Sequence, residues 1–157
     1  MIFSAWEHGS GYIRLFANYR DIFKPAAIDF SIGDAGDERL LKPETSKSYE
    51  TGLKARVFQG RMSMELASFL MDFDNLVISQ TVNGLPSLTN AGKQRFKGIE
   101  TAAAWYLPAH IAGRVTYSYH DARFRNFIQE FDPGAPMQLA GKRFEMSARN
   151  LFSAGLT

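Results

Sequence analysis

The stretch "LKPETSKSYETGLKAR", Leu41 to Arg56, begins as a turn and then alternates strictly between two kinds of side chain. One series consists of Lys47, Tyr49, Thr51, Leu53, Ala55 and Val57, and the other of Ser46, Ser48, Glu50, Gly52, Lys54 and Arg56. A period of two predicts a β-strand, because successive side chains of a strand point to opposite sides of the sheet. The stretch therefore predicts a strand that separates two different environments.

The same alternation recurs along the chain and predicts about six strands. It is clear at residues 11–20, 94–107 and 111–122, and it is expected again from Lys142 to the C-terminus. It is weakest in "RMSMELASFLMDF", where both faces become apolar, so a helix from about Met62 to Met71 is a local alternative. Several of these segments reach about ten residues, which suffices for a tilted strand to cross an apolar belt of about 25 Å.

Short and long connections alternate between the predicted strands. "VFQGR" and "LPAHI" are short and contain Gly or Pro, whereas three other connections are long. The middle long connection contains Asn83-Gly84, which favours a type I′ hairpin turn between strands that continue beyond the belt. Long loops would count against a compact soluble domain, but they are typical of the extracellular side of an outer-membrane barrel.

Aromatic residues on the more apolar face lie at the predicted strand ends. Tyrosines occur next to the long connections and Trp105 next to the short turn "LPAH", as two interfacial girdles would require; the tyrosines are Tyr19, Tyr49, Tyr117 and Tyr119. The opposite face carries charges that a hydrated lumen would solvate, namely Arg14, Glu50, Lys54, Arg56, Glu100 and Arg114. An open sheet with one face in water is the alternative explanation.

Composition excludes several classes of protein. The chain has 157 residues, 45% of them apolar, which is enough for one domain or part of one. Eighteen basic and sixteen acidic residues leave a charge of +2 without any basic run, so nucleic acid is not an expected partner. The absence of cysteine excludes disulfides and thiolate metal sites. No apolar run approaches the roughly 20 residues of a membrane helix, and the N-terminus does not read as a signal peptide.

No motif predicts an enzyme, a cofactor or a resident metal. The acidic "DFDN", Asp72 to Asn75, lacks the spaced oxygen ligands and the glycine of a calcium loop. His8, His110 and His120 are far apart in the sequence and imply no metal cluster. There is no nucleophile elbow and no glycine-rich phosphate loop, so no catalytic residue is predicted.

Six segments in combination resemble the C-terminal half of a TonB-dependent outer-membrane receptor of the ferric-siderophore type. "LKPE" precedes Ser-Tyr-Glu-x-Gly-Leu-Lys, and Asn-x-Gly precedes Gly-Ile-Glu, in the order of that family. The segments are "YIRLFANYRDIFKPA", "LKPETSKSYETGLKA", "ELASFLMDFDNLVIS", "TNAGKQRFKGIETAAAWYL", "RVTYSYHDARF" and "LAGKRFEMSARNLFSAGLT". They cover most of the chain from Gly11 onward.

The resemblance implies an all-β, antiparallel transmembrane barrel of 22 strands, closed by an N-terminal plug, in the bacterial outer membrane. Residues 1–157 would supply about six of its strands, and they lack the plug, the TonB box and the C-terminal strands. The implied partners of the parent protein are a ferric siderophore or a similar scarce nutrient, TonB through the plug, and outer-membrane lipid. Candidate substrate-binding residues in the loops are Phe23, Arg123, Arg125 and Phe127. The alternatives are a soluble β-sheet ligand-binding module and a passive porin.

Overall fold

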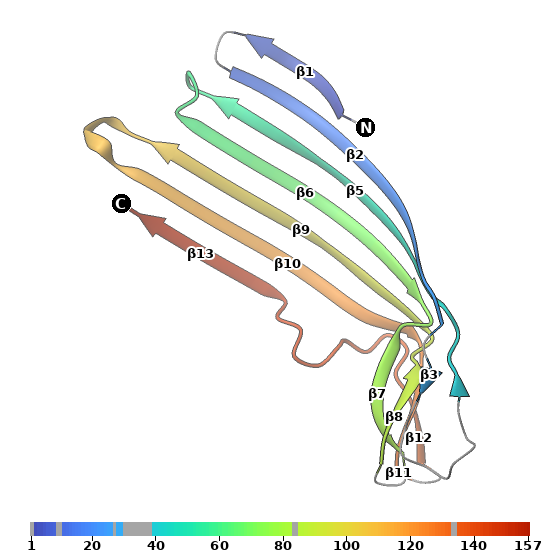
Figure 1. Cartoon of the computed structure of the whole chain (residues 1–157). Helices are drawn as coiled ribbons and strands as arrows, with labels where there is room; N and C mark the ends of the chain where they lie inside the picture. Colours follow the sequence, from blue (N-terminus) through green and yellow to red (C-terminus); the bar gives the residue numbers. More distant parts are fainter. Residues whose placement is uncertain (1, 9–10, 27, 30–38, 83–84, 133–134) are drawn as a thin grey trace.

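The computed structural model describes residues 2–8, 11–26, 28–29, 39–82, 85–132 and 135–157. Most of them form one antiparallel sheet of seven strands in the order β1-β2-β5-β6-β9-β10-β13 (Figure 1). Each strand of this sheet therefore pairs with the strand of the same sheet that comes next in the chain. The strands are β1 (Ile2–His8), β2 (Gly11–Lys24), β5 (Glu44–Val57), β6 (Met62–Asp74), β9 (Lys93–Tyr106), β10 (Ala112–Asn126) and β13 (Asn150–Leu156).

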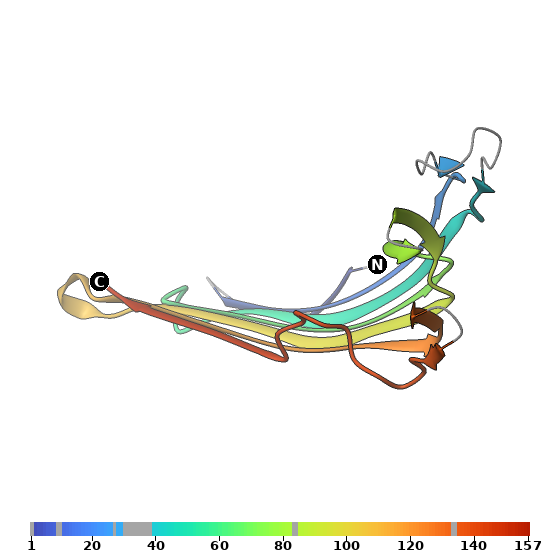
Figure 2. The ribbon, with the colours of Figure 1, turned by 90° about the horizontal axis from the view of Figure 1, so that it is seen from below.

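The two ends of the sheet differ in their connections. At one end β5 is followed by the tight turn before Met62, and β9 by the 3-10 turn η1 (Pro108–His110). At the other end lie three small two-stranded pairs, as Figures 1 and 2 show. These are β3 (Ile28–Asp29) with β4 (Arg39–Leu40), β7 (Val77–Val82) with β8 (Leu85–Asn90), and β11 (Ile128–Asp132) with β12 (Ala135–Gln138). The predicted alternation of short and long connections is confirmed.

Three details differ from the sequence-based expectations. The sheet has seven strands in place of about six, because the first residues form β1. The helix considered for Met62 to Met71 is wrong, since this segment lies between β5 and β9 as strand β6. The last strand begins at Asn150 and not near Lys142, because residues 142–149 follow β10 through scattered backbone hydrogen bonds without a regular ladder.

The middle long connection forms the expected hairpin. Strands β7 and β8 pair antiparallel, so the flanking strands do continue beyond the main sheet. Asn83 and Gly84, on which the type I′ turn was predicted, lie outside the described residues. Within the described ranges, no helix has the length and apolarity needed to span a membrane.

The register fixes which side chains share a face, since directly paired residues point to the same side of a sheet. We call the face that carries Leu15, Tyr19 and Tyr49 the outer face, and the face that carries Glu50 and Glu100 the inner face. Leu15 pairs with Leu53, and the rings of Tyr19 and Tyr49 lie 5.1 Å apart. The two series read from the sequence therefore extend as continuous stripes across β2, β5, β6, β9 and β10.

Glycines leave room for aromatic rings on neighbouring strands. Gly98 on the inner face pairs with Phe69, and a Cβ at this glycine would lie 2.7 Å from the ring atom Cζ of that phenylalanine. Gly113 on the outer face is covered in the same way by Trp105, whose Nε1 would be 2.6 Å from an added Cβ. Each missing side chain is thus replaced by a ring from the adjacent strand, which keeps both faces covered.

The outer face changes character toward the long-connection end of five strands. Going toward the long connections, an apolar residue or tyrosine is followed two positions later by a charged residue, which is the next one on that face. The pairs are Tyr19 and Asp21, Tyr49 and Lys47, Leu70 and Asp72, Ile99 and Lys97, and Tyr119 and Asp121. In β6 the stretch before this boundary runs from Met62 to Met71, about the length that a tilted strand needs to cross a membrane.

The sheet is curved and its outermost strands each have one neighbour. Figure 2 shows the curvature, with β7–β8 and the β3–β4 pair folded up at the end with the long connections. Strands β1 and β13 form the two edges. Burial among the described residues is concentrated at the long-connection end, where Ala91, Phe124, Phe127 and Leu139 form a small core. The arrangement is a segment of a barrel wall and not a closed barrel.

Candidate functional site

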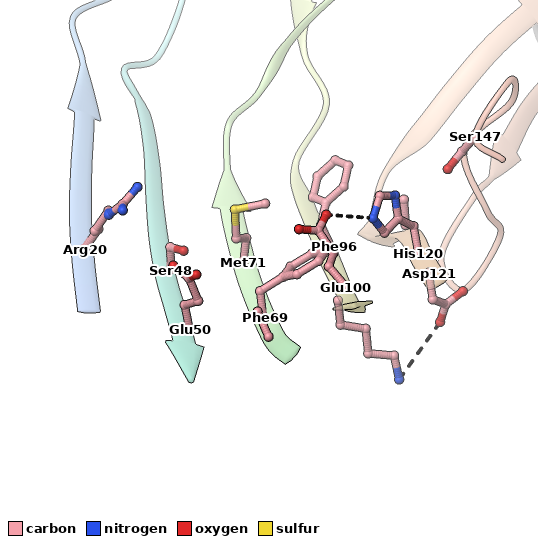
Figure 3. Close-up of a pocket in the computed structure, with 13 residues that line it drawn as sticks. Arg20, Ser48, Glu50, Phe69, Met71, Phe96, Glu100, His120, Asp121 and Ser147 are labelled. Carbon is pink, nitrogen blue, oxygen red and sulfur yellow. Dashed lines mark hydrogen bonds and ion pairs between the residues drawn. The ribbon is translucent and has the colours of Figure 1, made fainter. Parts of the chain in front are cut away.

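A hollow lies mainly on the inner face, toward the end with the long connections. Its volume is about 510 Å³. Strands β2, β5, β6, β9 and β10 and the segment before β13 contribute side chains to it (Figure 3). The residues labelled there are Arg20, Ser48, Glu50, Phe69, Met71, Phe96, Glu100, His120, Asp121 and Ser147. Lys97 and Asp121 also border the hollow, although both belong to the outer-face series of their strands.

The hollow combines charged groups with aromatic surface. The His120 Nε2 lies 3.2 Å from Glu100 Oε1, as Figure 3 shows, and the Phe69 ring meets the His120 ring edge-on at 5.6 Å. The Asn18 amide donates to Glu50 at 3.4 Å. A surface of this kind can contact both the polar and the apolar parts of an amphipathic ligand, since rings supply area and ionic groups supply orientation.

Five phenylalanines extend from the hollow toward the long connections, and Phe96 belongs to both. Phe144, which precedes β13, is stacked on Phe96 of β9 with ring centroids 5.2 Å apart and lies 4.2 Å from Phe124 of β10. Phe73 meets Phe96 edge-on at 5.3 Å, and Phe127 stacks on Phe124 at the same separation. These contacts explain why both faces of β6 become apolar toward its end. They also hold residues 142–149 against β10.

Two of the motifs that carry the family resemblance, "LKPE" and Asn-x-Gly, are in direct contact. The Asn90 side chain accepts a hydrogen bond from the Lys42 backbone N–H at 2.8 Å and donates to the Lys42 carbonyl at 3.1 Å. It also donates to the Asn75 carbonyl at 2.7 Å, while the Asn75 amide reaches the Pro43 carbonyl at 3.3 Å. Gly92 has φ +60°, and a Cβ there would collide with the carbonyl oxygen of Asn126. We call this arrangement the Asn90 clasp.

The Asn90 clasp joins the connection before β5 to the base of the β7–β8 hairpin. The sequence did not predict this contact, because Lys42 and Asn90 are 48 residues apart and no local pattern links them. The glycine at the end of Asn-x-Gly was the available hint, since a positive φ favours glycine. The motifs therefore have a structural role in shaping the end of the sheet that carries the hollow.

Ion pairs occupy the outer face beyond its tyrosines. The Arg95 guanidinium donates to both carboxylate oxygens of Asp72, at 2.6 and 2.7 Å. Asp72 follows the membrane-length stretch of β6, and its hydrogen bonds from Arg95 lower the pKa of its carboxyl group below the ordinary value. On β10, Asp121 is 5% exposed and receives the Arg123 Nε at 2.9 and 3.0 Å. The "DFDN" segment thus marks the end of a strand, as the sequence predicted.

The four candidate substrate-binding residues do not form one site. Phe23 is 64% exposed near the end of β2, on the outer face. Arg123 and Arg125 lie within β10 and not in a loop, and Arg123 also donates to the Gly141 carbonyl. Phe127 is 6% exposed and packs in the small core. Within the residues that the structure describes, no three His, Asp or Glu side chains lie close enough to hold a metal ion.

Comparison with known proteins identifies the family. Residues 6–157 match the family described as "TonB dependent receptor-like, beta-barrel". The metal-pseudopaline receptor CntO of Pseudomonas aeruginosa is 31% identical over 110 residues, which are 70% of this chain and 15% of that receptor. The ferripyoverdine receptor of the same species is 29% identical over 101 residues, 64% of this chain and 12% of that protein.

A solved structure shares the fold. The alcaligin outer membrane receptor FauA from Bordetella pertussis superposes with a TM-score of 0.57 at 23% identity, covering 92% of this chain and 23% of that one. The chain therefore spans a small part of the length of the proteins that it resembles. With the match over residues 6–157, the two-faced sheet and its alternating connections, the chain belongs to the family of TonB-dependent receptor β-barrels, which are proteins of the bacterial outer membrane.

Proposed function

We propose that this chain is part of the barrel wall of a receptor that imports a ferric siderophore, or a similar scarce metal chelate, across the outer membrane. The observation that carries the proposal is the family match over nearly the whole chain, together with an inner face that is both charged and aromatic. In this reading the seven strands belong to a 22-stranded barrel, whose remaining strands and plug are supplied by other parts of the parent protein.

The inner-face hollow is the proposed contact surface for the cargo or for the plug that moves with it. Rings of Phe69 and Phe96 supply stacking surface, and Arg20 and His120 supply hydrogen-bond donors. A metal chelate with polar oxygens around an apolar periphery needs both kinds of contact. The four residues expected from the sequence to contact the ligand, Phe23, Arg123, Arg125 and Phe127, remain a separate proposal for ligand contact at the extracellular end.

Energised uptake distinguishes this function from a passive porin. In cells that produce the complete receptor, iron-limited growth and uptake of radiolabelled iron should be restored by one or a few ferric siderophores and abolished by deletion of TonB. Binding at the cell surface should survive that deletion. Uptake that continues without TonB and rises linearly with concentration would instead indicate a pore.

A second measurement tests the class of protein. A soluble ligand-binding module should yield a stable monomer in water without detergent. A barrel wall exposes an apolar outer face and unpaired strand edges, so the chain alone should associate or precipitate unless detergent is present. The proposal is contradicted by a monodisperse, detergent-free monomer of residues 1–157.

Residue-level tests separate the two proposed contact regions. Phe69→Ala and Arg20→Gln in the complete receptor address the hollow. Replacement of Arg123 and Arg125 by Gln addresses the contact residues expected from the sequence. A loss of ferric-siderophore affinity of tenfold or more, about 1.4 kcal/mol, is expected for contacts that are desolvated in the complex. Unchanged affinity would remove the corresponding region from the binding site.

A further inference from the structure

The segment before β13 contains a bulge at the edge of the hollow. The His120 N–H donates to the Arg149 carbonyl at 2.9 Å, and the Phe144 N–H donates to the Ala122 carbonyl at 3.1 Å. Between these two hydrogen bonds β10 has one residue, whereas the other segment has four. Residues 145–148 therefore loop out of the sheet, as in a large β-bulge. We call residues 145–148 the lip.

Contacts at its base hold the lip in a fixed shape. The Arg143 Nη2 donates to the Ser147 carbonyl at 3.2 Å and to the His120 carbonyl at 3.4 Å. The Arg143 Nε lies 3.6 Å from a carboxylate oxygen of Asp121. Phe144, directly before the lip, is packed among the phenylalanines of the inner face. The guanidinium of Arg143 thus ties the lip to β10.

Met146 in the lip combines two unfavourable features. Its φ of +54° lies in the left-handed region, where a Cβ crowds the backbone, so glycine is favoured there. Its side chain is fully exposed and gains no burial within the described residues. Backbone strain that the surrounding structure maintains is typical of residues that clamp a ligand.

The lip borders the hollow proposed to contact the cargo. Ser147 lines the hollow beside His120 and Asp121, as Figure 3 shows, and Met146 is the next residue. The thioether side chain of methionine is apolar, adapts to irregular surfaces and makes favourable contacts with aromatic rings. An exposed methionine at this place suits the apolar or aromatic periphery of a metal chelate.

We propose that Met146 is a further contact residue for the cargo and that Arg143 is its positioning residue. In this arrangement the charged groups of the hollow orient a ferric chelate, and the lip covers part of the apolar periphery of the chelate. The inference rests on the proposed transport function. It adds a contact that the rings of the hollow do not supply, because the lip belongs to the connection between β10 and β13 and not to a strand.

Cysteine labelling in the purified complete receptor tests this contact. The uptake assay offers ferric siderophores of the hydroxamate, catecholate and mixed types, and the one that is imported serves as the probe. Met146→Cys, in a background without other cysteines, should react with a maleimide and should react at least fivefold more slowly once the probe is bound. Labelling that the probe does not slow would overturn the proposal. So would labelling that is already blocked without it, because another part of the receptor would then cover the lip.

Phe58 provides the matched control. It also has a positive φ, +53°, and an exposed side chain, but it lies in the turn between β5 and β6 at the other end of the sheet. Phe58→Cys should be labelled equally with and without the probe. Slower labelling at Phe58 would indicate a general conformational change and would contradict a local contact at Met146.

Removal of the Met146 side chain measures its contribution to affinity. Met146→Gly should relieve the backbone strain, leave the yield of folded barrel on a heat-modifiability gel undiminished, and weaken probe binding about tenfold through lost apolar burial. Met146→Leu, which keeps an apolar side chain, and Phe58→Gly, which relieves the same kind of strain elsewhere, should both bind within about threefold of the unsubstituted receptor. Unchanged affinity in Met146→Gly would overturn the proposal.

Arg143→Gln tests the positioning role. It removes the guanidinium from the Ser147 carbonyl and should weaken probe binding, but the double variant with Met146→Gly should be no weaker than Met146→Gly alone. Losses that add would contradict positioning through Met146. If no siderophore is imported, the transport proposal fails and this inference fails with it. Normal import with unchanged affinity of Met146→Gly would overturn the inference alone.

Discussion

Replacement of Asn90 by Ala tests the Asn90 clasp most directly. The substitution removes an acceptor for the Lys42 N–H at 2.8 Å and a donor to the carbonyls of Lys42 and Asn75, at 3.1 and 2.7 Å. It leaves the β7–β8 ladder intact, because the Asn90 backbone still pairs with Val77. The connection before β5 should therefore loosen locally without unfolding of the hairpin.

The expected magnitude follows from the surroundings of the three hydrogen bonds. A hydrogen bond contributes about 0.5–1.5 kcal/mol to stability. The two bonds to Lys42 are exposed, so water replaces much of their contribution, whereas the bond to the Asn75 carbonyl is partly buried. We expect a local loss of about 1–2 kcal/mol, which corresponds to a roughly 5- to 30-fold higher opening equilibrium.

Amide hydrogen exchange in the complete receptor measures this opening. The Lys42 amide should exchange roughly 5- to 30-fold faster in the Asn90→Ala variant. Asn90→Asp retains the acceptor but sets a carboxylate against two carbonyl oxygens, so it should be at least as disruptive. Asn18→Ala, which removes one 3.4 Å hydrogen bond on the inner face, is the control and should not affect the Lys42 amide. Unaltered exchange at Lys42 after removal of the Asn90 side chain would refute the clasp.

Three further substitutions test other parts of the structure. Gly98→Val should sharply reduce the yield of folded barrel on a heat-modifiability gel, because its Cβ would meet the Phe69 ring and a backbone oxygen. Gly155→Val should not, because an added Cβ at Gly155 would have nothing within 4 Å. Phe144→Ala should lower the free energy of unfolding by about 1–3 kcal/mol, because the ring contacts with Phe96 and Phe124 are lost. It should also expose residues 142–149 to limited proteolysis, and unchanged cleavage would contradict this packing. Asp72→Asn should remove a small stabilisation, below about 1 kcal/mol because the Asp72–Arg95 pair is partly exposed. The carboxyl group of Asp72 has a lowered pKa in the folded protein, so this stabilisation is present above the pKa of the unfolded state and is lost as the pH falls through the folded pKa. The pH midpoints of acid unfolding of the unsubstituted protein and the Asp72→Asn variant measure this stabilisation, and equal midpoints would argue against it.

Sequence reasoning succeeded where the pattern is local. The alternation at Lys47 to Val57 predicted a strand with two faces, and the lengths of the connections predicted which ends of the strands lie together. For Met62 to Met71 it left a helix as an alternative to the strand. The alternation is weak there because inner-face side chains such as Phe69 are apolar as well. Lys142 was misplaced as a strand start, because the contacts of its segment with β10 are irregular.

The sequence by itself determined most of the strands, their two faces and the family resemblance, because side-chain alternation and motif order are properties of the chain read in one direction. Only the tertiary structure decided which residues meet across strands. It paired Asn90 with Lys42, stacked Phe144 on Phe96, and showed Arg123 bound to Asp121 on the outer face. Such contacts depend on register, and register depends on the packing of each strand against both of its neighbours. The opening stretch "LKPETSKSYETGLKAR" contains both kinds of information: its alternation is local, and the fixing of its "LKPE" by Asn90 is not.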